Sequence, residues 1–205
     1  MMKKLMLTGF EPFLHFKTNP TMKIVEELDG QVINGFRIYG RILEVDFKKS
    51  GNQILDCWNE IKPDAVISLG LAAGRSAITP ERIAINCNDG EQDNSGNLPS
   101  GEKIMEDGPD GLFSTLPIRS MVDKLKQQNY PAAISNSAGA YLCNHVMYQI
   151  LYRLKQKELI RPAGFIHIPA SHELAIQYGK IPSWFQEDLT QAIRLCIETL
   201  ESYSQ

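Results

Sequence analysis

Apolar residues along this chain alternate between short continuous runs and stretches in which they recur at helical spacing. The run at residues 65–69 is typical of a strand buried on both faces, whereas Ile54, Trp58 and Ile61 mark one face of an amphipathic helix. The strands predicted in this way span residues 4–8, 36–45, 65–69, 82–87, 132–135 and 164–168. The predicted helices span residues 20–28, 54–61, 118–125, 141–155 and 186–200.

This alternation of strands and helices predicts one α/β domain over residues 1–205. The expected architecture is a three-layer α/β/α sandwich around a mixed, mainly parallel, twisted sheet. In folds of this kind the reactive groups gather at the carboxyl ends of the strands. We therefore look for chemistry in the residues that follow each predicted strand.

Residues 88–111 break the alternation, because they are almost entirely Asn, Asp, Glu, Gly, Ser and Pro. A structureless connection of this length inside a compact domain is commonly functional or packed against a partner subunit. We expect a long polar loop here.

Composition excludes several classes of protein. The chain has 205 residues, 43% of them hydrophobic, and a formal net charge of −3. It has no basic stripe for nucleic acid and no run of about 18 apolar residues that could cross a membrane. The apolar start at residues 5–7 is too short for a signal peptide. We expect a cytoplasmic protein that binds neither nucleic acid nor membrane.

Four widely spaced cysteines predict neither a disulfide framework nor a metal site. Cys57 and Cys196 lie in apolar helical patterns and Cys87 lies in a strand, so we expect all three to be packing residues. The fourth, Cys143, follows a strand and a Ser-Ala-Gly turn and stands at the start of a predicted helix.

The helix start gives Cys143 a possible chemical role. Unpaired N–H groups and the helix dipole favour a thiolate there, which lowers the thiol pKa, and the same groups could stabilise an oxyanion. The alternative is that Cys143 only fills space, which is the commoner role of a cysteine taken at random.

A thiolate nucleophile needs a general base, and the chain offers four histidines. His145 is nearest to Cys143, but residues two apart on a helix point in different directions, so we expect a structural role for it. His167 lies near the end of a predicted strand and could approach Cys143 through space, although a hydrogen-bonded core histidine is the alternative. His15 and His172 are expected in loops, in contact with solvent.

An acidic residue would orient that imidazole. Glu81 is the best placed, because it precedes a strand and lies close to the turn at residues 70–74. A surface ion pair with its neighbour Arg82 is the competing explanation. The other acidic candidates lie in the polar loop and are expected to be solvated: Glu91, Asp93, Glu102 and Asp107.

Phe10, Phe13 and Phe16 form an aromatic cluster after the first strand, where they could bury a small flat ligand or simply pack in the core. Asn19 could supply an amide partner to such a ligand. The turn at residues 70–74 lacks the glycine order of a phosphate-binding loop, so a nucleotide site is only weakly supported.

Four separated segments of the chain, in this order and spacing, are similar to one family. They are Gly9-Phe10-Glu11-Pro12-Phe13 with Asn19-Pro20, Gly74-Arg75 with Ile78-Thr79-Pro80-Glu81-Arg82-Ile83-Ala84-Ile85-Asn86, Ser137-Ala138-Gly139-Ala140-Tyr141-Leu142-Cys143-Asn144-His145, and Gly164-Phe165-Ile166-His167-Ile168-Pro169. The chain resembles the pyroglutamyl-peptidase I family across nearly its whole length.

The resemblance implies a cytoplasmic cysteine peptidase that removes N-terminal pyroglutamyl residues from peptides without a metal or cofactor. It implies that Cys143 is the nucleophile, His167 the base and Glu81 the residue that orients the base. It also implies a homotetramer. The residues implied to bind the substrate are Phe10, Phe13, Asn19, Leu71 and Leu142.

Three departures from the family pattern affect the substrate pocket. Members usually have Gln where this chain has Leu71, and Arg close to the position of Glu91, where the loop is also one residue shorter. Residues 43–47 replace a segment that contains proline in relatives. Two alternatives therefore stay open: a thiol hydrolase of this fold with another N-terminal or lactam-like acyl preference, and a non-catalytic small-molecule-binding relative.

Overall fold

The computed structural model describes residues 2–13 and 16–200, and within them six strands form a central sheet. The strand order is β2-β3-β1-β4-β10-β5, with parallel pairing of β3 with β1, β1 with β4 and β4 with β10. The two outermost pairs are antiparallel, so the sheet is mixed but mainly parallel, as predicted. These strands are β1 (Lys3–Phe10), β2 (Val32–Ile33), β3 (Phe36–Leu43), β4 (Ala65–Leu71), β5 (Thr79–Pro80) and β10 (Ala163–Ile168).

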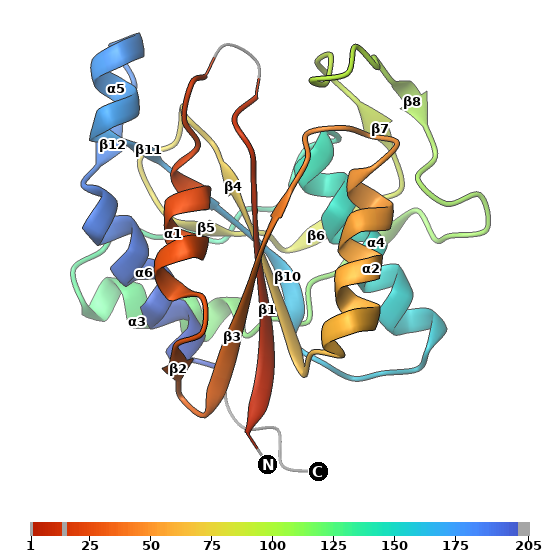
Figure 1. Ribbon diagram of the computed structural model, residues 1–205, viewed down its shortest axis with the longest axis horizontal. Coiled ribbons are helices and arrows are strands. Elements are labelled where there is room, and N and C mark those ends of the chain that lie inside the picture. Colours follow the sequence, from red (N-terminus) through yellow and green to blue (C-terminus); the bar gives the residue numbers. More distant parts are fainter. Residues whose placement is uncertain (1, 14–15, 201–205) are drawn as a thin grey trace.

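Helices cover both faces of this sheet, which gives the predicted three layers (Figure 1). On one face lie α1 (Pro20–Leu28), α3 (Ile118–Gln127) and α6 (Gln186–Glu198). On the other lie α2 (Ser50–Ile61) and α4 (Leu142–Gln156).

The central strands are buried on both faces because their sequences are continuously apolar. In β1, Leu5 and Leu7 join the core under α1, α3 and α6, while Met6 between them joins the core under α2 and α4. All seven residues of β4 and all six of β10 are buried. Successive side chains in a strand point to opposite faces, so such a strand needs a cover on each side.

The polar segment from residue 88 to 111 has more structure than predicted. Its β7 (Asn88–Asp89) pairs with β8 (Ser100–Glu102), and β9 (Gly111–Phe113) pairs with β6 (Ile83–Ile85). Asp93, expected in solvent, is only 6% exposed and accepts hydrogen bonds from the backbone N–H groups of Phe47, Ser95 and Asn97. A buried carboxylate organises this loop.

Two other predictions were wrong. The strand predicted at residues 132–135 is reduced to isolated bridges, from Ala132 to Ile78 and from Ser135 to Glu81. The segment after β10, expected as loop, contains β11 (Ala170–Ser171), α5 (His172–Tyr178) and β12 (Ser183–Trp184). Ser171 caps α5 by accepting from the N–H of Leu174, a short-range signal that apolar periodicity does not reveal.

Candidate active site

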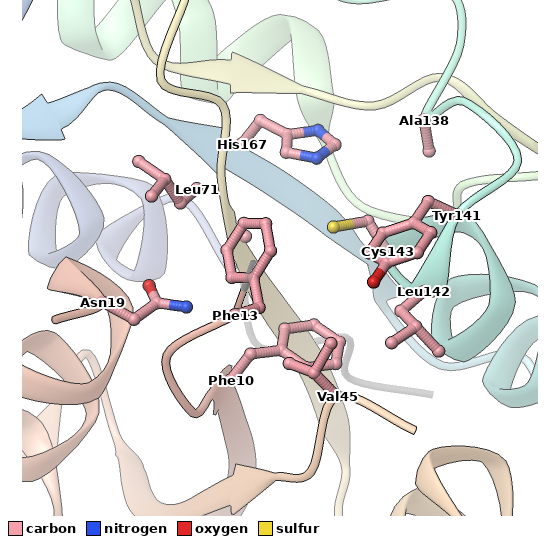
Figure 2. A pocket seen from close by; sticks show the side chains of 11 residues that line it. Phe10, Phe13, Asn19, Val45, Leu71, Ala138, Tyr141, Leu142, Cys143 and His167 are labelled. Atoms are coloured by element: carbon pink, nitrogen blue, oxygen red, sulfur yellow. The ribbon is translucent and has the colours of Figure 1, made fainter. Parts of the chain in front are cut away.

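A cavity of about 200 Å³ opens where β1, β4 and β10 reach their carboxyl ends, next to the start of α4 (Figure 2). This is the edge at which an α/β sheet is expected to present its reactive groups. The residues predicted to act on or bind a substrate that line this cavity are Phe10, Phe13, Asn19, Leu71, Leu142, Cys143 and His167.

Cys143 is the second residue of α4, and its sulfur projects into the cavity that the imidazole of His167 also lines (Figure 2). The N-cap residue of α4, Tyr141, makes no side-chain capping hydrogen bond. The first backbone N–H groups of α4 therefore remain available at the cavity. Burial raises the pKa of the Cys143 thiol to about 12, with a further contribution from Glu81. The pKa is thus raised, where the helix start predicted a lowering, because burial outweighs the opposing effects of the Arg75 charge and of the Cys143 backbone N–H.

His167 lies in β10, is 6% exposed, and forms a 2.6 Å hydrogen bond from Nδ1 to Oε1 of Glu81. Burial lowers the pKa of His167, while the hydrogen bond and negative charge of Glu81 oppose that shift. Since an ionised carboxylate can only accept, Nδ1 carries the hydrogen and Nε2 has a free lone pair. The Nε2 atom is the basic one.

Glu81 is fully buried, yet it is held ionised. Burial alone would raise its pKa, but hydrogen bonds from His167 and Arg75 together with the His167 charge leave that pKa below its usual value. The backbone N–H of Glu81 also donates to the carbonyl of Phe165, which ties it to β10 at 2.9 Å.

The arginine that contacts Glu81 is Arg75, not its sequence neighbour Arg82. Arg82 Nε donates to Oδ1 of Asn136 at 2.7 Å, whereas Nη1 of Arg75 donates to Oε1 of Glu81 at 2.8 Å. The chain bends at Arg82, between β5 and β6, and its guanidinium contacts Asn136 and not the carboxylate. The surface ion pair weighed against a catalytic role for Glu81 is therefore not formed with Arg82.

Gly70 leaves the space that the Cys143 sulfur and the Phe165 ring occupy beside β4. It is the register partner of His167 in the neighbouring strand. A Cβ atom at Gly70 would lie 2.8 Å from Sγ of Cys143 and 2.7 Å from the ring of Phe165. A glycine inside an apolar strand is a sequence signal for close approach, and it could have identified this position.

Aromatic side chains form the apolar wall of the cavity. Phe10 is 3% exposed and packs against Phe165 with ring centroids 6.4 Å apart. Phe13 contacts Phe16 edge to face, and Phe16 in turn contacts Tyr178 of α5. Phe10 and Phe13 line the cavity, whereas Phe16 packs between Phe13 and the C-terminal half of the chain.

Asn19 lines the cavity and also caps α1. Its Oδ1 accepts from the N–H and the hydroxyl of Thr21, and its Nδ2 donates to the carbonyl of Glu11. The amide oxygen is thus committed to the fold, and only the NH₂ group has remaining donor capacity for a ligand.

The other three histidines differ in position. His145 is buried and forms a 2.9 Å hydrogen bond with Asn88, in keeping with the structural role expected of it. His172 was expected in a solvated loop, but it begins α5 and its Nδ1 pairs with Oγ of Ser183 at 2.8 Å. His15 lies outside the described residues.

The remaining residues that line the cavity were not among the predicted site residues, although the family resemblance linked residues 43–47 to this pocket. Val45, Ala138 and Tyr141 complete it together with Gly70. Val45 and Tyr141 come from loops brought together only by the fold, which leaves no local periodic signal. In the described part of the chain, no cluster of three or more His, Cys, Asp or Glu residues could hold a metal ion. No helix within those residues is long and apolar enough to cross a membrane.

Known sequences that are similar to this chain indicate one family. A family model described as pyroglutamyl peptidase matches residues 3–203. The pyrrolidone-carboxylate peptidase of Oceanobacillus iheyensis is 55% identical over 200 residues, which cover 98% of this chain and 100% of that protein. The protein of the same name from Lysinibacillus sphaericus is 58% identical over 197 residues, with 96% of each chain covered.

Solved structures agree with the sequence comparison. The pyrrolidone carboxyl peptidase of Thermococcus litoralis superimposes with a TM-score of 0.92 at 41% identity, covering 96% of this chain and 92% of that one. A mutant of the enzyme of this name from Pyrococcus furiosus gives a TM-score of 0.93 at 42% identity, covering 98% and 100%.

Proposed function

The chain belongs to the pyroglutamyl peptidase family, and we propose that Cys143, His167 and Glu81 carry out the removal of N-terminal pyroglutamate from peptides. The observation that supports these roles most strongly is the 2.6 Å bond between His167 and Glu81 beside a cavity that also contains the Cys143 sulfur. The three residues come from α4, β10 and the segment after β5.

The resting site holds a neutral thiol and a neutral imidazole, because burial raises the pKa of Cys143 and lowers that of His167. The proton must therefore move as the sulfur attacks. Nε2 of His167 takes the thiol proton while Sγ bonds to the pyroglutamyl carbonyl carbon. The ionised Glu81 stabilises the imidazolium that forms.

The oxyanion formed in this step is stabilised by the first N–H groups of α4, which are free of intrahelical partners. Collapse of the intermediate breaks the C–N bond, and the leaving amine takes the proton from His167. Water then gives a proton to Nε2 and attacks the thioester. Pyroglutamate is released and the proton returns to the sulfur.

The cavity suits a small uncharged ring. Its volume of about 200 Å³ lies below the roughly 300–1,000 Å³ of sites for drug-sized ligands. Phe10, Phe13, Leu71 and Leu142 give apolar contacts, and the NH₂ group of Asn19 is a donor within the lining. A lactam buried there avoids the desolvation cost of a charged amino terminus.

Hydrolysis of a pyroglutamyl-coumarin and a prolyl-coumarin substrate tests the proposed function. We expect release from the pyroglutamyl compound only, with turnover abolished in Cys143→Ser and retained in Cys57→Ser, a half-buried thiol on α2. Equal release from both compounds would support the hydrolase with another acyl preference. Ring binding without turnover would support the non-catalytic relative.

Assembly and location are also proposals. We propose a homotetramer in the cytoplasm. Exposed apolar side chains support self-association, because Ile176 in α5 and Phe185 before α6 are 85% and 62% exposed. The four cysteines are all free, as expected in a reducing compartment. Light scattering of the purified protein would measure the subunit count, and a monomer would contradict the tetramer.

A further inference from the structure

Two hydrogen-bond chains link Arg75 to His167, one through the Glu81 carboxylate and one through the Thr79 hydroxyl. Its Nη1 donates to Oε1 of Glu81, the same oxygen that accepts from Nδ1 of His167. The same Nη1 donates at 2.5 Å to the hydroxyl of Thr79, and that hydroxyl donates to the backbone carbonyl of His167 at 3.4 Å. The Arg75 guanidinium therefore contacts Glu81, which bonds the His167 side chain, and Thr79, which bonds the His167 backbone.

The position of Arg75 is itself determined by the fold. Its N–H closes a turn onto the carbonyl of Ala72, directly after β4. Its side chain is 34% exposed, so the head group reaches a fully buried carboxylate from the edge of the protein. Arginine presents several donors in a planar fork and stays charged at any ordinary pH, which suits it to this contact.

We propose that Arg75 is a positioning residue, which shares Oε1 of Glu81 with His167 and holds the carboxylate in the orientation that orders the imidazole toward Cys143. This inference rests on the proposed roles of the three catalytic residues. Arg75 acts through Glu81 and Thr79 rather than through contact with the ring pocket. Its loss should therefore lower kcat more than it raises KM.

The charge of Arg75 adds a second consequence. The charged and titratable groups that act on His167 are Glu81 and Arg75, and the same two act on Cys143. Arg75 lowers the pKa of all three residues: Glu81 through its hydrogen bond, and His167 and Cys143 through its charge. Without the guanidinium, each group would take up a proton at higher pH.

Three variants test the proposal: Arg75→Gln, Arg75→Lys and Arg82→Gln. The last is the matched control, because it removes a positive charge from the residue next to Glu81 in the sequence. We expect Arg75→Gln to lose about 100-fold in kcat, since two hydrogen bonds of a charged donor disappear. The acidic limb of its kcat/KM profile should move to higher pH. Arg82→Gln should match the wild type in both respects.

Arg75→Lys separates charge from geometry. A lysine keeps the positive charge but lacks the planar guanidinium that fixes the direction of the donor shared by Glu81 and Thr79, so we expect a loss of about tenfold in kcat with an unmoved acidic limb. The rate of Cys143 alkylation by iodoacetamide against pH gives a readout independent of turnover. Its midpoint should rise in Arg75→Gln and stay in place in Arg75→Lys.

Several outcomes would overturn the proposal. These are an Arg75→Gln profile that superimposes on the wild type, an equal shift in Arg82→Gln, or full kcat in Arg75→Lys. The lysine variant decides the matter if circular dichroism shows that the glutamine variant does not fold. Failure of the proposed function is distinguishable, because the wild type would then lack pyroglutamyl turnover.

Discussion

Among the described residues, two buried histidines lie near the start of α4, and they differ in the residue that each one contacts. His167 is 6% exposed and bonds the carboxylate of Glu81, while His145 is 5% exposed and bonds the amide of Asn88. Burial lowers the pKa of both imidazoles, to about 4 for His145. Only His167 has a negative charge that opposes this shift. The partner, rather than the depth of burial, therefore equips an imidazole to accept a proton.

The surroundings of His145 explain its different role. Its ring packs edge to face on Phe47, and a Cβ atom at Gly51 of α2 would lie 2.6 Å from its Nε2 atom. The preceding Asn144 is fully buried and makes three hydrogen bonds to the backbone of Ile85 and Cys87. This region attaches α4 to its neighbours and so fixes the position of Cys143, the proposed nucleophile.

Replacing Glu81 by Gln removes the feature that distinguishes the two histidines, and we expect the largest effect from it. The amide cannot stabilise an imidazolium, and it can favour the wrong tautomer of His167. We expect kcat to fall by about 10³ to 10⁴-fold, measured with a pyroglutamyl-coumarin substrate. A variant that keeps more than a tenth of the activity would exclude Glu81 as the orienting residue.

Gly70→Ala tests the packing around the Cys143 sulfur and removes no ionisable group. The new Cβ would displace the sulfur or the Phe165 ring, and we expect a loss of about 100-fold in kcat/KM. Gly74→Ala is the matched control, because nothing lies within 4 Å of a Cβ at that position. Equal activity of the two variants would contradict the proposed geometry around Cys143.

His145→Gln is expected to change the pH dependence of stability more than turnover. The folded pKa of about 4 lies below the ordinary 6.5, so the unfolded chain binds the proton first as pH falls. This residue therefore contributes stability that is complete above pH 6.5 and decreases toward pH 4, by about 3 kcal/mol in total.

Urea unfolding between pH 4.5 and 7.5 would measure this contribution. The variant should show a smaller rise in the free energy of unfolding with pH than the wild type, and the remaining rise should include the part due to His167. Parallel curves for the two proteins would show that His145 is not held neutral in the fold.

Asn88→Asp would give His145 a carboxylate like the one beside His167, and it should have the smallest effect on turnover. We expect the pKa of His145 to rise from about 4, because a negative charge favours the imidazolium. An NMR titration of the imidazole would measure it. A large loss of activity would instead place His145 in the proton path.

The residues proposed to carry the chemistry were not equally predictable from the sequence. Cys143 and His167 follow from a helix start and a strand end, because both positions are readable from local periodicity. Arg75 could not be separated from Arg82 in this way, since the choice depends on which guanidinium the fold brings to the Glu81 carboxylate. The polar segment around Asp93 was misjudged because its partners are backbone N–H groups, which composition does not reveal.

The sequence alone determined the alternation of strands and helices, the burial of β1, β4 and β10 on both faces, and therefore the sheet edge at which chemistry could occur. These properties depend on the spacing of apolar residues over a few turns or strand positions. The tertiary structure decided which side chains meet. Glu81 and His167 are 86 residues apart, and their bond exists only because β5 and β10 pair in one register. Contacts of that range depend on the whole sheet, so no local pattern contains them.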